Sequence, residues 1–401
     1  MDMGQNFFQG GDKAMCSGCG ACEQACPVNA LSMREDEEGF LFPVKDAKVC
    51  IDCGLCERIC PFSSPDYSND VAPDIFAAYL KDNAERMRSS SGGLFYLIAC
   101  DVIDRGGVVV GAMLDSGLQC RHAVAETLEE LEPLRSSKYV QSATGDIFRR
   151  VRDILLRGRE VYFTGTPCQV AGLKAFLRKD YPNLLTSDLI CHGVPNQRLF
   201  NEHIQYLEQK RGDKVVKYKF RNDEKWGGCE SAYHADSQTP VMSPGYIFSP
   251  YLYSFINGLT FRYSCYNCTF ATLPRQGDIT LADFWGVQGV FPDMDVKNGV
   301  SMVSVNSAKG VEVWRRIKHK TEHRKSTVDA AKRLNHNFAS TSVMPRIRPY
   351  VYRLIRKNGY QFVAINLFRP SLPERLMVRI KNLIRGVVGA ENIKRLKRVL
   401  G

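Results

Sequence analysis

The 401-residue sequence has no run of the roughly 18 to 20 apolar residues that a membrane-spanning helix requires. Its first 15 residues lack the apolar core and cleavage site of a secretory signal. We therefore expect a cytoplasmic protein, because thiols stay reduced there and thiolate-ligated clusters persist. Solenoid repeats and low-complexity tracts are also absent. With 44% hydrophobic residues, a chain of this length predicts two or three domains with a sizeable core.

Acidic residues are scarce in the last quarter of the chain. From Lys309 onward, 23 Lys and Arg residues stand against 5 Asp and Glu, so this quarter carries +18 while the whole chain carries +11. Residues 371–385 show an amphipathic helical pattern, and residues 393–400 are a second basic segment. Such helices lie on the anionic inner face of a membrane, bind an acidic partner, or pack on their own domain, and the sequence leaves these three interpretations open. Nucleic-acid binding is not expected, because no aromatic-interleaved pattern accompanies the charge.

Cysteine, in contrast, is abundant, with 15 residues. Residues 16–27 and 50–61 both read C-x2-C-x2-C-x3-C-P. Three thiolates at this spacing bind three corners of one 4Fe-4S cluster, and the fourth binds the neighbouring cluster. The pattern predicts two clusters with crossed ligands, one on Cys16, Cys19, Cys22 and Cys60 and the other on Cys50, Cys53, Cys56 and Cys26. The alternatives are two zinc sites, which normally need only paired C-x2-C motifs, and a disulfide framework, which a reducing compartment disfavours.

The coarse secondary-structure pattern divides the chain into four parts. Residues 1–65 are expected to form an α+β ferredoxin-like module, and the polar residues 66–70 a linker. Strand and helix patterns alternate over residues 71–325, which predicts an α/β domain with a mixed sheet, closed by a helix over residues 309–320. Residues 326–401 are expected to form a short basic helical extension.

Four further cysteines stand where metal ligands are often found. Cys168 and Cys191 each follow a predicted strand, and Cys265 and Cys268 form a C-x2-C pair in a predicted turn. Strand ends of an open α/β sheet meet at one crevice, so these three loops are expected to converge. The residues leave open whether the loops hold a third cluster or whether Cys168 and Cys191 are ordinary buried thiols. The remaining three cysteines are expected to be structural: Cys100, Cys120 and Cys229.

The sequence lacks the G-x-G-x-x-G fingerprint of dinucleotide-binding folds. It nevertheless has loops rich in groups that bind phosphate or a flavin ring. The segment from Ser89 to Gly93 precedes a predicted helix, whose N-terminal N–H groups and dipole favour a pyrophosphate. Lys138 and the polar side chains near Cys168 would add a cation and hydrogen-bond donors. The alternative is that the serines and glycines only cap the helix and that Lys138 is a solvated lysine.

Residues from about 75 to 310 resemble a known family. The resemblance is carried by six segments that occur in order: 88–93, 137–142, 163–169, 190–193, 265–268 and 277–286. These segments are similar to those of the beta subunits of coenzyme F420 hydrogenases and dehydrogenases, a family that includes the reductase of 7-hydroxymethyl chlorophyll. With the module in front, the resemblance covers about three quarters of the chain.

The resemblance implies an FAD and a third 4Fe-4S cluster in the α/β domain. It makes the four cysteines 168, 191, 265 and 268 the cluster ligands. The residues that it implies for FAD are Ser90, Ser91, Gly92, Gly93, Lys138, Tyr139, Gln141, Ser142, Thr164, Thr166 and Gln169. His192, beside Cys191, is the candidate proton donor or ring contact.

The function implied is that of an iron-sulfur flavoprotein oxidoreductase. Clusters carry single electrons, and a flavin exchanges one or two, so electrons would pass between reduced ferredoxin or another redox protein and a deazaflavin or other organic substrate. The direction of flow is left open. The main alternative is an electron-transfer subunit without substrate chemistry of its own, and a structural metal-binding protein is a weaker one.

Overall fold

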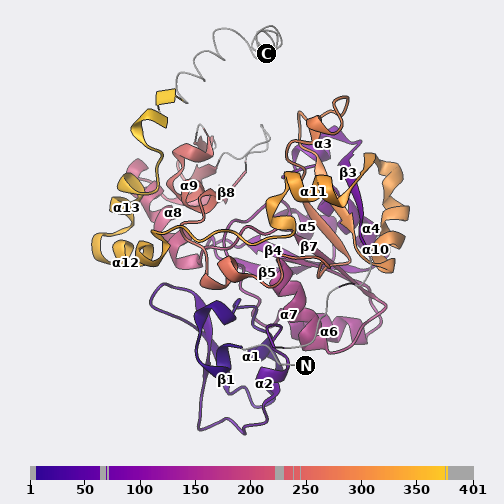
Figure 1. Ribbon diagram of the computed structural model, residues 1–401, viewed down its shortest axis with the longest axis horizontal. Coiled ribbons are helices and arrows are strands. Elements are labelled where there is room, and N and C mark those ends of the chain that lie inside the picture. Colours follow the sequence, from indigo (N-terminus) through magenta and orange to yellow (C-terminus); the bar gives the residue numbers. More distant parts are fainter. Residues whose placement is uncertain are drawn as a thin grey trace.

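The computed structural model describes residues 6–63, 69, 72–221, 230–237, 239–243, 245–374 and 376–377. Figure 1 shows three parts: a small N-terminal module below, a lobe built on an eight-stranded sheet, and a mainly helical lobe beside it that contains the C-terminal helices α12 and α13. None of the described helices is long and apolar enough to cross a membrane. The second basic segment, 393–400, and most of the linker 66–70 lie outside the described residues.

The N-terminal module contains little regular structure. Strands β1 (Leu31–Glu35) and β2 (Leu41–Lys45) form an antiparallel hairpin, and α1 (Ala21–Ala25) and α2 (Leu55–Arg58) are single turns within the two cysteine segments. Gly20 begins α1 in the left-handed region, at φ +76°. A Cβ atom there would also lie 2.6 Å from Thr144 Oγ1, so only glycine allows both the turn and this close approach. The cysteine loops are thus shaped by backbone conformation more than by a core of their own.

The large sheet is mixed, as the sequence predicts. Its order is β13-β3-β12-β11-β7-β6-β4-β5. The four neighbours β4, β6, β7 and β11 are parallel, and every other pairing is antiparallel. The strand bounds are β3 Asp74–Leu80, β4 Val108–Leu114, β5 Cys120–Ala125, β6 Val161–Gly165, β7 Leu184–Leu189, β11 Ile279–Asp283, β12 Ser301–Val305 and β13 Thr321–Ser326.

Helices cover both faces of this sheet. Along β4, the side chain of Val109 packs with α4 (Leu94–Asp104) and α10 (Ala308–Ile317), whereas Val108 and Val110 pack on the opposite face with α6 (Ile147–Leu156) and α7 (Pro167–Leu177). Alternate residues of a strand point to opposite faces of the sheet. A strand with continuous apolar residues, such as β6 with Val161, Tyr162 and Phe163, is therefore buried on both sides. Three shorter helices complete this lobe: α3 Asn83–Met87, α5 Leu128–Leu131 and α11 Val328–Leu334.

The helical lobe has its own core, rich in aromatic side chains such as Phe200, Tyr251 and Tyr352. It surrounds a three-stranded antiparallel sheet of order β10-β9-β8. Its elements are α8 Gln197–Arg211, β8 Val215–Lys219, β9 Ser231–His234, β10 Val241–Met242, α9 Pro250–Ile256, α12 Arg348–Asn358 and α13 Tyr360–Asn366. Phe40 and Phe42 of the β1–β2 hairpin belong to the same core, so the N-terminal module is packed against this lobe as well.

One detail of the C-terminal half differs from expectation. The helix expected over 309–320 does not close the α/β domain, because β13 follows it and pairs with the edge strand β3. The helices after residue 326 also contribute buried side chains such as Val351, Ile355 and Val363 to the core of the helical lobe.

Arg348 provides a test of how the C-terminal helices hold the N-terminal module. Its buried guanidinium donates to both carboxylate oxygens of Glu38, at 3.1 and 2.7 Å. We expect Arg348→Met to lower the free energy of unfolding by about 3 to 5 kcal/mol, because Glu38 would be left buried without its partner. Denaturant unfolding measures this change. The double variant Glu38→Gln, Arg348→Met should lose less, and equal losses in both would contradict the prediction.

Candidate functional site

The four core cysteines meet at one cavity, whose wall they share. Cys168 and Cys191 reach it from the loops after β6 and β7, and Cys265 and Cys268 from the 3₁₀ segment Tyr263–Asn267 and its end. Because β6 and β7 are parallel neighbours, with Gly165 opposite Asp188, their carboxyl ends leave the sheet at the same edge. The structure therefore brings together the residues that the sequence placed in three separate loops.

Local sequence fixes how two of these cysteines are presented. Thr166 and Gln169 form a reciprocal capping box at the start of α7, and Pro167 occupies its first turn. Cys168 follows, with its Sγ 3.1 Å from Thr166 Oγ1. After Cys191, the chain turns at Gly193, whose φ of +137° is accessible in practice only to glycine. A Cβ there would also meet the ring of Phe261 at 2.4 Å, so this turn admits no side chain.

The core thiols are held in their neutral form by burial. Burial raises the pKa of Cys265 to about 12 and that of Cys268 to about 11. Burial also raises the pKa of Cys191, and the neighbouring Cys265, Cys168 and Cys268 raise it further. As free thiols, these groups keep their protons at neutral pH. Binding of metal would therefore release protons.

The first N-terminal set is also brought together. Burial raises the pKa of Cys60 to about 11, and the neighbouring Cys16 adds to the rise. Burial raises the pKa of Cys22 as well, with further contributions from Cys19, Cys16 and Cys60. Cys16, Cys19, Cys22 and Cys60 thus stand within electrostatic reach of one another in a largely buried region.

The second N-terminal set lies nearer the surface. Cys53 is exposed, whereas Cys50 and Cys56 are half-buried. Cys53 contributes to the raised pKa of Cys56, and Cys50 accepts a hydrogen bond from Asp52 N at 3.4 Å. Cys26 Sγ accepts from Ala30 N at 3.2 Å. Its membership of this set stays a prediction.

The arrangement of the cysteine thiols bears on the two alternatives to iron-sulfur clusters, disulfides and zinc sites. The 14 described cysteines are all free, so no described pair forms a disulfide. Within the described residues, no three His, Cys, Asp or Glu side chains are close enough together to hold a single metal ion. Ligands of a cube each bind a different iron and stand farther apart than the ligands of one zinc ion.

The N-terminal module contributes directly to the wall of the core cavity. Ser17 and Phe62 line it together with Cys168. Thr144 Oγ1 donates to Cys19 O at 2.9 Å, and Gln141 Nε2 donates to Ser17 O at 2.8 Å. These bonds hold the Cys16–Cys22 loop against the sheet lobe.

A glycine of α7 makes this contact close. A Cβ atom built at Gly172 would lie 2.9 Å from both Cβ and Sγ of Cys19. Cys168, one turn earlier on the same helix, contributes to the raised pKa of Cys19. The two cysteine sets are therefore neighbours across a closely packed boundary, which suits them to the passage of electrons from one to the other.

The segment expected to bind pyrophosphate lies at the N-terminus of α4. Gly93 begins this 11-residue helix at φ +87°, and as a glycine it has no side chain with which to cap the first N–H groups. Ser90 Oγ accepts from Ser137 N at 2.7 Å, which joins two of the segments expected to bind FAD. Ser91 Oγ is buried without a hydrogen-bond partner, and Gly92 N donates to Ser301 Oγ.

Other candidate flavin residues already have partners in the protein. Gln169 Nε2 donates to Ser142 O at 3.0 Å, besides its role in the capping box. Lys138 Nζ donates to the carbonyl oxygens of Pro133 and Arg135, and burial lowers its pKa to about 7. The ring of Tyr139 packs against Phe255, 4.6 Å between centroids.

His122 joins two more of these candidates. Its Nδ1 lies 2.8 Å from Ser142 Oγ, and its Nε2 lies 3.1 Å from Thr164 O. A carbonyl oxygen only accepts, so Nε2 carries the proton and Nδ1 accepts from Ser142. This histidine was not found from the sequence, because an isolated His in a strand has no distinguishing pattern.

His192, the candidate catalytic residue, is exposed and does not line the cavity. Its backbone carbonyl accepts a hydrogen bond from Ser342 Oγ. A catalytic role for its ring stays a prediction.

Two arginines near the cavity were not found from the sequence. Arg275 lines the cavity and pairs with Asp188 at 3.3 Å, with both side chains fully buried. Arg262 donates to Cys16 O and Cys16 Sγ, at 2.6 and 3.4 Å. From the sequence alone, both would be taken for ordinary surface residues, because arginine is seldom buried unless it is paired.

Two segments of this chain match known protein families. Residues 158–330 match the C-terminal part of the coenzyme F420 hydrogenase/dehydrogenase beta-subunit family, and residues 15–64 match the 4Fe-4S dicluster domain. Among solved structures, the chain is similar to one from the F420-reducing [NiFe] hydrogenase complex of Methanosarcina barkeri. The identity is 18%, with 68% of this chain and 91% of that chain covered and a TM-score of 0.47. No curated protein matches the chain.

Because His122 is buried and neutral, we predict that the folded protein loses stability in acid. Burial lowers its pKa to about 4, against about 6.5 in an unfolded chain, although the bond to Thr164 opposes the shift. The unfolded chain binds the extra proton between these values, so stability falls as the pH falls from about 6.5 to about 4, by about 3 kcal/mol. Denaturant unfolding at pH 7 and pH 4.5 measures this loss. His122→Gln should reduce it, and an equal loss in both proteins would contradict the assignment.

Proposed function

Because this chain carries a domain of the coenzyme F420 hydrogenase/dehydrogenase beta-subunit family behind a 4Fe-4S dicluster domain, we propose that it is an iron-sulfur flavoprotein oxidoreductase. It acts between a redox protein, such as reduced ferredoxin, and a deazaflavin or another organic substrate, in the cytoplasm. The observation that carries the proposal is the shared cavity: Ser17 and Phe62 of the N-terminal module line it together with the four core cysteines.

The core cavity fits a third 4Fe-4S cluster. Its wall supplies four thiols from three segments, and most of the remaining lining is apolar, including Phe62, Val194 and Phe270. A cube needs four separate thiolate ligands and an enclosure that limits water. Cys168, Cys191, Cys265 and Cys268 would hold it, each by its Sγ.

The N-terminus of α4 fits the pyrophosphate of FAD. Its N-cap residue, Gly93, has no side chain to cap the first N–H groups, and the buried Ser91 Oγ has no hydrogen-bond partner among the described residues. A phosphate oxygen accepts from such donors and gains from the helix dipole. Ser90, Ser91 and the Gly92–Gly93 backbone would bind the phosphates, and Lys138 would add a positive charge nearby.

When bound, clusters supply one-electron transfer and a flavin exchanges one or two electrons. The positions of the chain's own cysteines support an order for these sites. The exposed Cys53 places the second N-terminal set at the surface, within reach of a protein partner. Cys19 and Gly172 hold the first set against α7, and Cys168 on the same helix faces the core cavity. Electrons from a docked protein would thus enter at the surface and leave in the sheet lobe, or travel in reverse.

Iron content tests the cluster assignment. Three cubes of four irons predict about twelve irons per chain in protein purified without air. Cys268→Ala is expected to remove about four of them, because the cavity would lose one of its four thiols. Cys100→Ala is the control, since this thiol lies in α4 and outside the cavity lining. About eight irons in the wild-type protein, or an unchanged content in Cys268→Ala, would refute a core cluster.

Substrate turnover separates the reductase from an electron-transfer module that serves another subunit. The protein purified without air would receive reduced ferredoxin or dithionite together with a deazaflavin, and formation of the reduced deazaflavin would be followed by absorbance. Turnover by the chain alone is expected of the reductase. Bleaching and reoxidation without turnover would favour the module, and the absence of extractable FAD would refute the flavin site.

A further inference from the structure

Arg262 stands apart from the other fully buried arginines. Arg86, Arg275 and Arg348 each form an ion pair, with Asp295, Asp188 and Glu38 respectively. Arg262 is 1% exposed, and its hydrogen bonds go to the carbonyl oxygens of Cys16 and Leu41 and to Cys16 Sγ. No carboxylate is among the partners of this guanidinium within the described residues. A buried charge without a counter-charge is costly, so an anionic group is expected beside it.

The position of Arg262 indicates which anionic group that is. Its backbone precedes Cys265 by three residues, and Cys265 N donates to Arg262 O at 3.0 Å. Its side chain crosses the boundary between the lobes and reaches Cys16 of the N-terminal module. The backbone of Arg262 thus contacts the core cysteine set, and its guanidinium contacts the first N-terminal set.

The guanidinium is directed toward the first N-terminal set, and the backbone of the same residue adjoins the core set. Nη2 donates to Cys16 Sγ at 3.4 Å, while Nη1 is buried and has no hydrogen-bond partner among the described residues. On the other side, Arg262 N donates to Val194 O at 3.0 Å, and Val194 lines the core cavity. The ring of Phe42 lies 4.0 Å from the guanidinium and shields it from water. Because water is excluded here, the positive charge of Arg262 is weakly screened and can act on both cysteine sets.

A cluster with four thiolate ligands is anionic, and reduction adds another negative charge. A fixed cation nearby favours the reduced form and raises the reduction potential, as do hydrogen bonds to the ligand sulfurs. Arg262 supplies a cation near both sets and a hydrogen bond to one ligand.

We propose that Arg262 is a positioning residue whose buried charge stabilises the reduced state of two clusters at once, the one on Cys16, Cys19, Cys22 and Cys60 and the one on Cys168, Cys191, Cys265 and Cys268. This inference rests on the proposed function, because it requires a cluster at both sets. It makes Arg262 a shared cation whose loss would shift both potentials in the same direction. A purely structural role, as a clamp between the lobes, would predict no effect on either potential.

The test is a redox titration of the full-length protein, purified without air and followed by electron paramagnetic resonance. Arg262→Gln removes the charge, Arg262→Lys keeps it, and Arg86→Gln is the control that removes a buried guanidinium bound to Asp295 and Gly299. At the wild-type midpoint, we expect Arg262→Gln to lower the ratio of reduced to oxidised cluster at both sets by at least tenfold. For a one-electron couple, this corresponds to about 59 mV toward more negative potential.

The other samples are expected to change little. Arg262→Lys and Arg86→Gln should keep midpoints near those of the wild-type protein. The cluster at the surface set with Cys53 serves as an internal control, because Arg262 has no bond to that set among the described residues.

The outcomes separate this inference from the function on which it rests. Wild-type protein with only about eight irons would refute the core cluster and the inference together. Full iron content with unchanged midpoints in Arg262→Gln would overturn the inference and leave the function intact. If Arg262→Gln loses iron, Arg262→Lys becomes the deciding variant. Retained iron with wild-type midpoint potentials in Arg262→Lys would support a role of the charge. Lost iron, or midpoint potentials shifted by about 59 mV, would show that Arg262 only clamps the lobes together.

Discussion

Burial of the thiols constrains the rest of this structure. Most cysteines of the core set and the first N-terminal set lie in regions where a thiolate is strongly disfavoured without nearby positive charge. The cysteines of such a region must be held in place by packing, because a loop open to water would leave their thiols hydrated and no longer buried. The sheet, the capping box at Thr166 and the turn at Gly193 all serve this purpose. Because a metal ligand must be a thiolate, these buried thiols would have to release their protons on binding iron.

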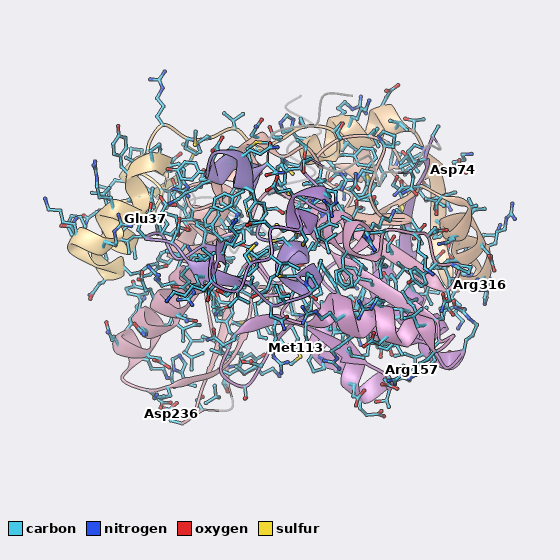
Figure 2. All side chains as sticks on the ribbon, turned by 90° about the horizontal axis from the view of Figure 1, so that it is seen from below. Glu37, Asp74, Met113, Arg157, Asp236 and Arg316 are labelled. Atoms are coloured by element: carbon cyan, nitrogen blue, oxygen red, sulfur yellow. The ribbon has the colours of Figure 1, made fainter. Side chains whose placement is uncertain are left out.

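The boundary between the N-terminal module and the two lobes is the second organising feature. Viewed from below, in Figure 2, Glu37 at the end of the N-terminal hairpin lies beside the yellow C-terminal helices. Arg356 Nη1 donates to Glu37 O there, and Arg348 binds Glu38. On the other side, Gln24 accepts from Phe148 N at 2.7 Å. A module with so small a core of its own is thereby held on both sides, and its cysteine loops keep a fixed position relative to the cavity.

The C-terminal quarter has a structural role that its charge conceals. Buried side chains of α12 and α13 complete the aromatic core of the helical lobe, and Tyr360 Oη lies 3.0 Å from His203 Nδ1. His203 in turn bonds Glu230 at 3.0 Å. The exposed faces still carry apolar side chains, among them Phe362 and Leu372. Packing on its own domain, one of the three interpretations of this quarter, therefore accounts for α12 and α13, and the chain after residue 377 remains open to the others.

The two ferredoxin-type motifs, the mixed α/β class and the loops that carry Cys168, Cys191, Cys265 and Cys268 follow from the sequence alone. These features depend on spacing and on periodicity, which are local properties of a chain. Tertiary packing, in contrast, sets which of those loops share a cavity, brings Ser17 and Phe62 to its wall, and lets β13 extend the sheet past the expected closing helix. Arg262 shows the reason most clearly, because its partners are 246 and 221 residues away in the chain. A buried charge is defined by what surrounds it, and that is settled only when distant segments pack together.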